Sequence, residues 1–268
     1  MKMVASAKLH KAQGAIENML PYQKQLNKIL TNFLSADLPV DSPFSTERPV
    51  KRVAIVAFSS NGSLCGAFNA NVLKMVLQTV GEYRELGQDN ILIYPVGKKI
   101  EESVKKLGFF PQGSYQHLSE KPSYEEAARL AHTLMDMFLN KEVDRVELIY
   151  HHFKSVGIQE LLRERYLPID LSSVKKESGE DNKVVNDYII EPSAEQLIAN
   201  LIPLVLSQKI FTSALDSSAS EHAARTMAMQ IATDNANELI QELTKQYNKT
   251  RQQAITNELL DIMGGSMS

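Results

Sequence analysis

The segment with the clearest chemical potential is the turn Ser59–Asn69, with the sequence SSNGSLCGAFN. It follows an apolar run that predicts a buried strand and precedes a predicted helix, which is where nucleotide-binding proteins place phosphate loops. Gly62 and Gly66, however, match neither GxGxxG nor GxxxxGK[ST], and no lysine follows to meet a phosphate. A tight turn with close backbone packing explains these glycines better than a phosphate site does.

The other candidate reactive side chains are one cysteine and a few histidines. Cys65 lies in the same turn. A lone thiol needs a base to become a nucleophile, and no pattern nominates one, so a packing role is favoured. His151 and His152 are adjacent on a predicted strand and point to opposite faces, so they cannot bind one metal together. His222 lacks an HExxH motif and is favoured as a surface or helix-seam residue. The sequence therefore nominates no catalytic, cofactor-binding or metal-binding residue.

The bulk composition argues against several classes of protein. The 268 residues carry a net charge of -3 with a pI near 6.1, unlike the strongly basic domain of a nucleic-acid-binding protein. No apolar run approaches the ~18 residues of a membrane span, and the first residues lack the apolar centre of a signal peptide. We therefore expect no nucleic acid partner and no direct membrane insertion. Any membrane association should go through partner proteins.

The sequence divides into three zones with different patterns. Residues 1–35 and 193–263 predict long helices, whereas residues 50–192 alternate short apolar runs with amphipathic segments. A proline-rich segment within residues 39–49 marks the first boundary. The expected fold is an α/β domain inserted between N- and C-terminal long helices that form an antiparallel coiled coil.

The N-terminal helix carries an apolar seam with an average spacing of about 3.5 residues, which is the coiled-coil signature. Its positions, eight of nine of them apolar, are Ala5, Leu9, Ala12, Ile16, Met19, Gln23, Leu26, Leu30 and Phe33. Gly14 and Pro21 interrupt the seam, and Pro21 is expected to bend the helix or break it locally. An ordinary amphipathic helix on a globular core is the alternative interpretation.

The C-terminal zone predicts one uninterrupted helix over residues 204–263, because it has no glycine there and its one proline, Pro203, precedes it. Such a helix would be ~90 Å long, whereas a globule of this chain length has a radius of gyration of about 18 Å. The helix must therefore project and needs a partner for its apolar stripe. We expect the N-terminal helix to run antiparallel to it, with Leu9 and Ile16 in the seam. Two shorter helices that meet near Asp234 are the alternative.

The middle zone predicts an α/β arrangement. The expected strands are residues 52–58, 91–96 and 145–153, and the expected helices are residues 67–86, 97–108 and 124–139. Alternating strands and helices favour parallel pairing through right-handed crossovers. Residues 172–186 are polar and charged, which predicts a flexible loop.

Four segments resemble F-type ATP synthase gamma subunits, and the resemblance spans nearly the whole chain. They are MKMVASAKLHKAQ at the start, the turn SSNGSLCGAFN, YIIEP at 188–192, and SEHAARTMAMQIATDNANELIQELTKQYNKTRQQAITNELLDIMGG near the end. The turn departs from the family's Ser-Asp-(Arg/Lys)-Gly-Leu-Cys-Gly at Asn61, Ser63 and Ala67. The C-terminal match is long and specific, so the chain is identified as a member of this family.

The resemblance implies a function that the residues alone do not. In this family the coiled coil is an asymmetric axle inside a ring of three alpha and three beta subunits. Proton or sodium flow through a membrane c-ring turns the axle, whose changing face alters the nucleotide affinity of each beta subunit. ATP chemistry stays in the ring, so the resemblance implies no catalytic residue and no cofactor here. It also implies contact with the epsilon subunit and a peripheral position on the cytoplasmic face of the bacterial plasma membrane.

The resemblance also nominates contact residues. Those matched to contacts with the alpha/beta ring are Arg251, Gln252, Thr256, Glu258, Lys2, Lys8 and Lys11. Tyr188 and Glu191 fall in the foot region near the membrane ring and the epsilon subunit. The alternative for each charged residue is a solvated helix charge, since a surface ion pair is worth only ~0–1 kcal/mol.

Two rival functions and one departure accompany the resemblance. A nucleotide-binding α/β enzyme would need the phosphate loop that the turn lacks, and a coiled-coil adaptor would merely bridge partners. Family members begin roughly a score of helical residues before the match to Met1. A mis-assigned start, a truncated chain and a short family member would each account for this difference. We expect the reading frame to continue upstream of Met1 for about six helical turns.

Overall fold

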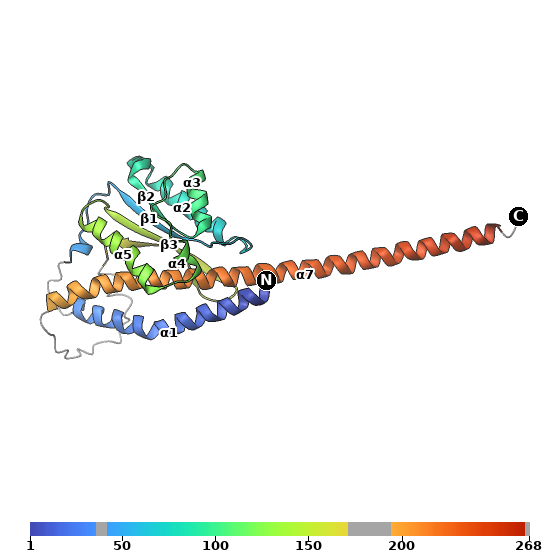
Figure 1. Cartoon of the computed structure of the whole chain (residues 1–268), viewed down its shortest axis with the longest axis horizontal. Helices are drawn as coiled ribbons and strands as arrows, with labels where there is room; N and C mark the ends of the chain where they lie inside the picture. Colours follow the sequence, from blue (N-terminus) through green and yellow to red (C-terminus); the bar gives the residue numbers. More distant parts are fainter. Residues whose placement is uncertain (36–41, 171–193, 266–268) are drawn as a thin grey trace.

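The computed structural model of the chain describes residues 1–35, 42–170 and 194–265. Two long helices, α1 (Lys2–Ser35) and α7 (Ala194–Gly265), lie beside an α/β domain. Figure 1 shows that the first half of α7 runs along this domain, whereas its second half extends away from the rest of the chain. The predicted arrangement of an α/β domain between two long helices is thereby confirmed.

The α/β domain contains a four-stranded sheet with the order β2-β1-β3-β4. The strands are β1 (Val53–Phe58), β2 (Ile91–Val96), β3 (Arg145–Phe153) and β4 (Gln159–Leu167). The central strand β1 is buried along its whole length and pairs in parallel with both β2 and β3. This confirms the three predicted strands and their parallel pairing.

The strand β4 was not predicted, and it pairs antiparallel with β3. Its sequence QELLRERYL is rich in charges, which hid its strand character. Those charges have partners: Arg163 bonds the buried carboxylate of Glu147 on β3, and Glu164 pairs with Lys209 of α7. A charged edge strand of this kind is stabilised by cross-strand pairs rather than by an apolar face alone.

The helices of the domain cover both faces of the sheet. They are α2 (Phe68–Glu82), α3 (Lys98–Lys106), α4 (Gln116–Glu120) and α5 (Tyr124–Leu139), with three-residue 3-10 helices at Pro43–Ser45, Arg84–Leu86 and Gln88–Asn90. The alternating residues of β1 divide between two cores: Ile55 packs with α2 and α3, whereas Val56 packs with α5 and α7. The domain core on that second face is therefore completed by the long C-terminal helix.

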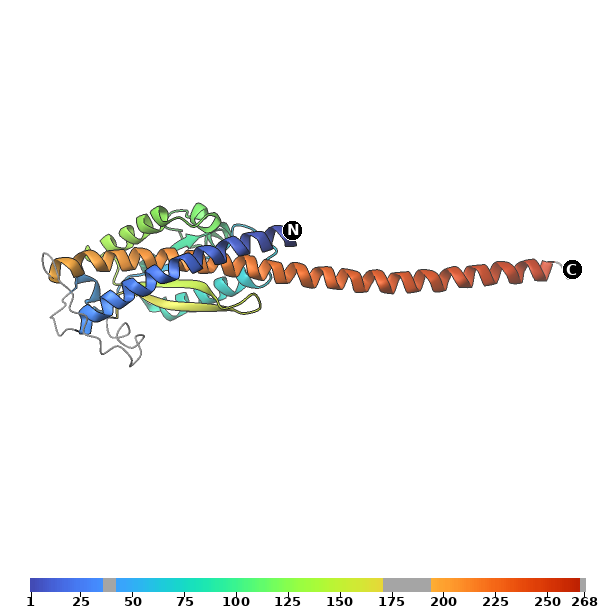
Figure 2. The same ribbon diagram turned by 90° about the horizontal axis from the view of Figure 1, so that it is seen from below.

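The two long helices run antiparallel, as predicted (Figure 2). Leu9 is buried against Ala219 of α7, and Ile16 is half-buried against the same cluster. At the start of α1 the ammonium group of Lys2 donates to the side-chain oxygen of Gln230. Within the described residues, α1 accompanies α7 as far as Gln230, so the predicted antiparallel contact of the two helices is confirmed there.

Pro21 and Pro203 lie inside the two long helices rather than at their ends. α1 continues through Pro21 and α7 begins nine residues before Pro203, so neither proline breaks its helix. The hydroxyl of Ser207 donates to the carbonyl of Pro203 at 2.8 Å. α7 is also continuous through Asp234, which excludes the alternative of two shorter helices. The predicted loop at 172–186 lies outside the described residues.

One helix has the length and composition of a membrane span. Within residues 196–263 of α7 an 18-residue window has a mean hydropathy of 1.4, which the search for apolar runs in the sequence had not found. Half of this window is buried inside the structure. A helix that packs against its own chain passes the same test, so this finding is weak evidence for a span.

Candidate functional site

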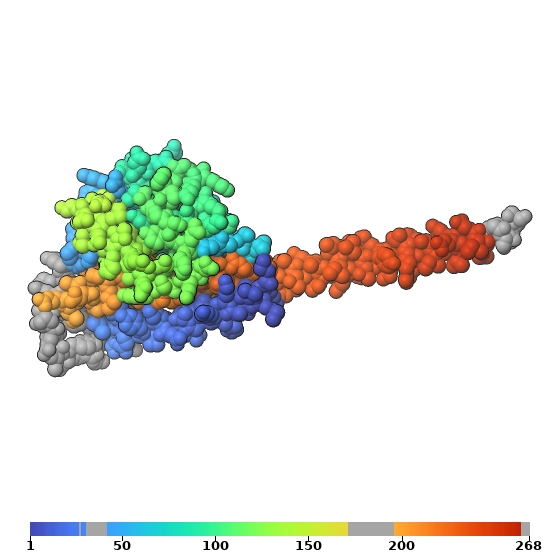
Figure 3. All heavy atoms as spheres, in the orientation of Figure 1, coloured from blue at the N-terminus to red at the C-terminus, as the bar shows by residue number. Residues whose placement is uncertain are grey.

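The most distinctive surface of the molecule is the free end of α7, which we call the tail (residues 231–263). Every side chain in this segment is exposed, and Figure 3 shows the tail as a single rod that no other described segment accompanies. At ~1.5 Å per residue it is roughly 50 Å long. It is the end of a helix of 72 residues. The first half of that helix packs against α1 and the α/β domain, and we call these parts together the body. The tail is therefore a lever that projects from a fixed base.

The tail exposes more apolar surface than a solvated helix needs. Its large apolar side chains, each between 48% and 68% exposed, are Ile231, Leu239, Ile240, Leu243, Tyr247, Ile255, Leu259, Leu260, Ile262 and Met263. Contiguous apolar exposure on this scale marks a surface that other proteins cover. The charged and amide side chains between them can give such contacts direction.

The predicted ring-contact residues fall into two separate groups. The group on the tail comprises Arg251, Gln252, Thr256 and Glu258, all exposed within about two turns of helix. The group near the start of α1 comprises Lys2, Lys8 and Lys11, which are also exposed. Because the start of α1 lies at the level of Gln230, the two groups are roughly 30 Å apart along α7. The structure does not bring them together into one site.

The remaining predicted site residues, Tyr188 and Glu191, lie outside the described residues. Of the tail group, the Thr256 hydroxyl donates to the backbone carbonyl of Gln252 at 2.8 Å, which is an internal helix contact. The guanidinium of Arg251 has no ion pair or hydrogen bond to another described residue. It is therefore available to an external partner.

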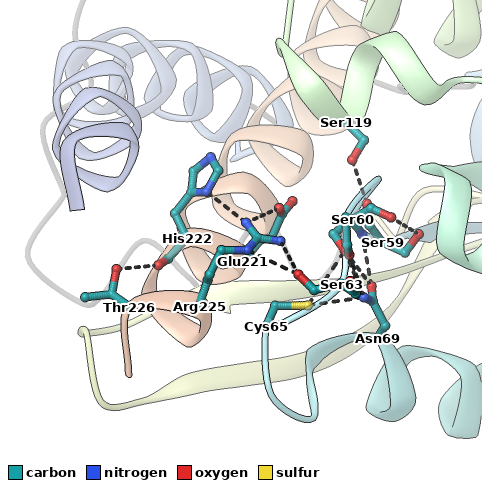
Figure 4. Close-up of polar contacts among 11 residues, drawn as sticks. Ser59, Ser60, Ser63, Cys65, Asn69, Ser119, Glu221, His222, Arg225 and Thr226 are labelled. Carbon is teal, nitrogen blue, oxygen red and sulfur yellow. Dashed lines mark hydrogen bonds and ion pairs between the residues drawn. The ribbon is translucent and has the colours of Figure 1, made fainter. Parts of the chain in front are cut away.

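The tail leaves the body at a junction formed by the turn 59–66 and residues 221–230 of α7 (Figure 4). Within the turn, the side chain of Asn69 accepts from the Ser60 backbone N–H at 3.0 Å and donates to the Cys65 sulfur at 3.2 Å. The Ser60 hydroxyl donates to the carbonyl of Gly62 at 2.5 Å. These bonds join the two ends of the turn to each other and fix its shape.

Backbone conformation at the turn accounts for its glycine-rich sequence. Gly66 has a φ of +59°, in the left-handed region that glycine adopts without strain, and the preceding Leu64 has a φ of +64°. A Cβ added to Gly62 would lie 3.4 Å from the guanidinium of Arg225. The positive φ of Gly66 supports the structural role that the sequence predicted for the glycines of this turn, whereas a Cβ at Gly62 would make only an ordinary contact with Arg225.

Arg225 joins the turn to α7 across 162 residues of sequence. Its Nη2 and Nε donate to the backbone carbonyl of Ser63 at 3.3 and 3.4 Å. Its Nη1 forms an ion pair with Glu221 at 2.6 Å, one helical turn earlier. Both side chains are largely buried, so the guanidinium is held in place from both sides. Figure 4 shows it reaching from α7 to the turn.

The titratable groups of the junction are perturbed mainly by burial. Burial raises the pKa of Glu221, and the neighbouring charges of Arg225 and Lys8 partly oppose this shift. Burial lowers the pKa of His222 to about 4, with smaller contributions in the same direction from Arg225 and Lys8. His222 is therefore neutral at pH 7 and is a buried seam residue, as predicted.

The end of β3 is a second attachment of the domain to α7. The Nδ1 atom of His152 lies 2.7 Å from a carboxylate oxygen of Asp216. His151 points to the opposite face, where its ring stacks on Phe68 at a centroid distance of 4.3 Å, and burial lowers its pKa to about 4. Its backbone carbonyl accepts from Ser220 of α7 at 3.3 Å. The prediction that the two histidines point apart is confirmed.

Cys65 is buried within the turn, with an exposed fraction of 2%. Its polar neighbours are the hydroxyl of Ser60 at 3.7 Å and the amide of Asn69, and neither group is a base at neutral pH. Within the described residues, no group of three or more His, Cys, Asp or Glu side chains is placed to hold a metal ion. The contacts of the junction thus attach the turn to α7.

Sequence reasoning missed the residues that make this attachment. The pair Glu221 and Arg225 has the four-residue spacing of a helical ion pair, which could have indicated a fixed guanidinium. Its partner carbonyl at Ser63 lies too far away in sequence for any local pattern to reveal. Asn69 was likewise visible only as a residue near the start of a helix.

A long helix that projects from an α/β domain and exposes an apolar surface is the architecture of a stalk-like subunit of a larger assembly. The model of the ATP synthase family matches residues 1–268 of the chain. An ATP synthase gamma chain of Bacteroides fragilis is 85% identical over 268 residues, which are 100% of this chain and 92% of the relative. One of Bacteroides thetaiotaomicron is 75% identical over the same shares of the two chains. The chain belongs to the family of ATP synthase gamma chains, which form the central stalk of F-type ATP synthases.

Solved structures share the fold. A chain in the central stalk and c-ring structure of Tetrahymena thermophila mitochondrial ATP synthase has a TM-score of 0.62 at 24% identity, with 87% of this chain and 97% of that chain covered. A chain of the Euglena gracilis mitochondrial ATP synthase has a TM-score of 0.57 at 19% identity, with 98% and 94% covered. The architecture of a long helical pair beside an α/β domain is therefore shared across distant sequences.

Proposed function

We propose that the chain works as the rotating shaft of its complex and couples ion translocation through the membrane sector to ATP synthesis or hydrolysis in the alpha/beta ring. The observation that carries this proposal is the tail, a stiff helix that projects roughly 50 Å from a firmly attached base. Its exposed surface carries apolar side chains such as Ile255 and Leu259 among charged and amide side chains, and under this proposal its contacts with the surrounding subunits change as it turns. Such contacts can favour different conformations of those subunits at different angles.

The body fits the other end of a shaft. α7 is held by α1, by the sheet through His152 and Asp216, and by the turn through Arg225 and Ser63. Torque applied to the domain can therefore reach the tail without slipping. Under this proposal the domain faces the c-ring and the epsilon subunit, and Tyr188 and Glu191 belong to that foot. The assembly lies on the cytoplasmic face of the plasma membrane.

The boundaries that we propose for the parts of the shaft follow the sequence zones. Residues 1–35 and 193–263 form the coiled-coil part, and residues 50–192 form the side domain. Under this proposal residues 2–35 of α1 support the first part of α7, and the alpha/beta ring surrounds the tail. Copurification tests the assembly directly: the chain should bring down alpha and beta subunits, whereas recovery with unrelated partners would support the adaptor function instead.

We expect the purified chain to hydrolyse no ATP. The turn matches no phosphate-loop pattern and has no lysine to hold a phosphate. Phosphate release should be measured with the isolated chain and with the assembled complex as a positive control. Stoichiometric turnover that persists after removal of all contaminating beta subunit would contradict the proposal and support a nucleotide-binding enzyme.

Replacing Arg251 and Gln252 together by alanine is expected to weaken coupling while leaving the fold intact. Both side chains are fully exposed on the tail, so their loss creates no cavity in the body. Coupling is measured as the ratio of ion pumping to ATP hydrolysis in membrane vesicles, with circular dichroism to check the fold.

A matched control for this variant replaces Lys74 and Gln78, an exposed basic residue and an exposed glutamine on α2. The control should retain normal coupling, because α2 lies on the face of the sheet away from α7. If the Arg251 and Gln252 variant couples as well as the control does, the contact implied by the resemblance is absent from this chain.

A further inference from the structure

The apolar contact between α1 and α7 is concentrated at two places. Near the start of α1, Leu9 and Ala12 pack against Ala219 and Ala223, with the half-buried Ile16 at the edge of the cluster, and we call this the outer contact. Near the end of α1, the inner contact consists of Leu26 and Leu30, which are buried in the large core together with Ile198, Leu201 and Ile202 of α7. The side chains of both contacts are apolar and buried.

Between the two contacts, α1 is poorly buried. None of the residues 13–25 is in the buried class, and two large side chains, Leu20 and Tyr22, are 42% and 45% exposed. Pro21 lies in this section and cannot donate the backbone hydrogen bond of a regular helix. The section is therefore a span between two anchored ends.

The matching section of α7 carries a buried polar side chain. Gln208 precedes Ala219 by 11 residues, or about three helical turns, so it lies on the same face of α7. The contact of Lys2 with Gln230 sets the register, which places Gln208 opposite the section 13–25. Gln208 is only 3% exposed, and neither its Nε2 nor its Oε1 has a hydrogen-bond partner in the described part of the chain.

A buried amide without partners favours any state in which water can reach it. The burial of Gln208 without a partner therefore destabilises the closed state of this section. The outer and inner contacts are apolar, so their burial stabilises the closed state at the two ends of α1. We infer that residues 13–25 of α1 open from α7 and close again locally while both ends stay in place. In the proposed shaft, on which this consequence depends, the opening lets α7 twist relative to α1 without breaking either contact.

Hydrogen exchange of the full chain, read by mass spectrometry, tests this inference. Amides of residues 13–25, corrected for intrinsic rates, should exchange at least about tenfold faster than those of residues 5–12 and 26–30. Replacing Gln208 by leucine should slow exchange in residues 13–25 about tenfold, which corresponds to about 1.4 kcal/mol of opening free energy. The matched control is Gln241→Leu in the exposed tail, which should change no rate in α1.

Two outcomes would overturn the inference: uniform protection along α1 in the natural chain, or unchanged rates in the Gln208→Leu variant when the control is also unchanged. If the variant fails to fold, the first comparison still decides, because it needs only the natural chain. Coupling in the assembled complex is a separate measurement. A chain that opens locally but does not couple would contradict the shaft function and leave the opening itself established.

Discussion

Replacing Ala219 by tryptophan should release the first half of α1 from α7 and lower the melting temperature of the chain by roughly 5–10 °C. Ala219 is fully buried in the outer contact, where Leu9 approaches it from α1. An indole cannot fit there unless the helices separate, and overpacking of this kind costs about 1–3 kcal/mol or more. Thermal unfolding followed by circular dichroism measures the shift, and hydrogen exchange locates it in residues 2–12.

The control for this substitution is Ala236→Trp, which introduces the same side chain on the exposed tail. It should leave the melting temperature of the isolated chain within about 2 °C, because surface substitutions rarely change stability by more than ~0.5 kcal/mol. Equal melting temperatures for the two variants would show that the helix pair does not contribute to the stability of the folded chain.

The second large effect is a loss of stability on acidification. Burial lowers the pKa of His151 to about 4 from an ordinary value of 6.5, so the folded state binds its proton less readily than the unfolded state does. The stability from this residue is therefore fully present above pH 6.5 and is lost as the pH falls from 6.5 to 4. At pH 5 the loss is about 2 kcal/mol, since one pKa unit corresponds to about 1.4 kcal/mol.

Replacing His151 by phenylalanine isolates this contribution. The ring can still stack on Phe68, but no buried proton site remains. Urea unfolding at pH 7 and at pH 5 should show a smaller loss of unfolding free energy for this variant than for the natural chain, by about 2 kcal/mol. The exposed His132→Phe on α5 is the control and should lose as much stability as the natural chain. Equal losses in all three proteins would show that His151 is protonated freely in the fold.

Periodicity and length predicted most of the architecture. The continuous run without glycine after Pro203 predicted a projecting helix, and the seam through Leu9 predicted its antiparallel partner. The buried run of β1 predicted a central parallel strand. These features depend on residues close together in sequence, where side-chain spacing reports directly on secondary structure.

The features that sequence did not predict depend on contacts between distant residues. The charged strand β4 is stabilised by pairs such as Arg163 with Glu147, which form only when β3 lies beside it. The extent of the helix pair depends on where Lys2 meets Gln230. The junction depends on Arg225 finding a backbone carbonyl, and backbone groups carry no signal in the sequence. The nominated residues on the tail came from resemblance, and their contacts stay predictions.

The contact between the start of α1 and the middle of α7 also has a consequence for folding during synthesis on the ribosome. The contact between Lys2 and Gln230 joins residues that are 228 positions apart, whereas the sheet uses only residues 53–167. At ~5–20 residues per second, synthesis of the chain from Lys2 to Gln230 takes roughly 10–50 s. The α/β domain has time to fold during that interval, but the apolar seam of α1 stays uncovered. The newly made chain therefore exposes the apolar seam of α1 to solvent until α7 has been synthesised.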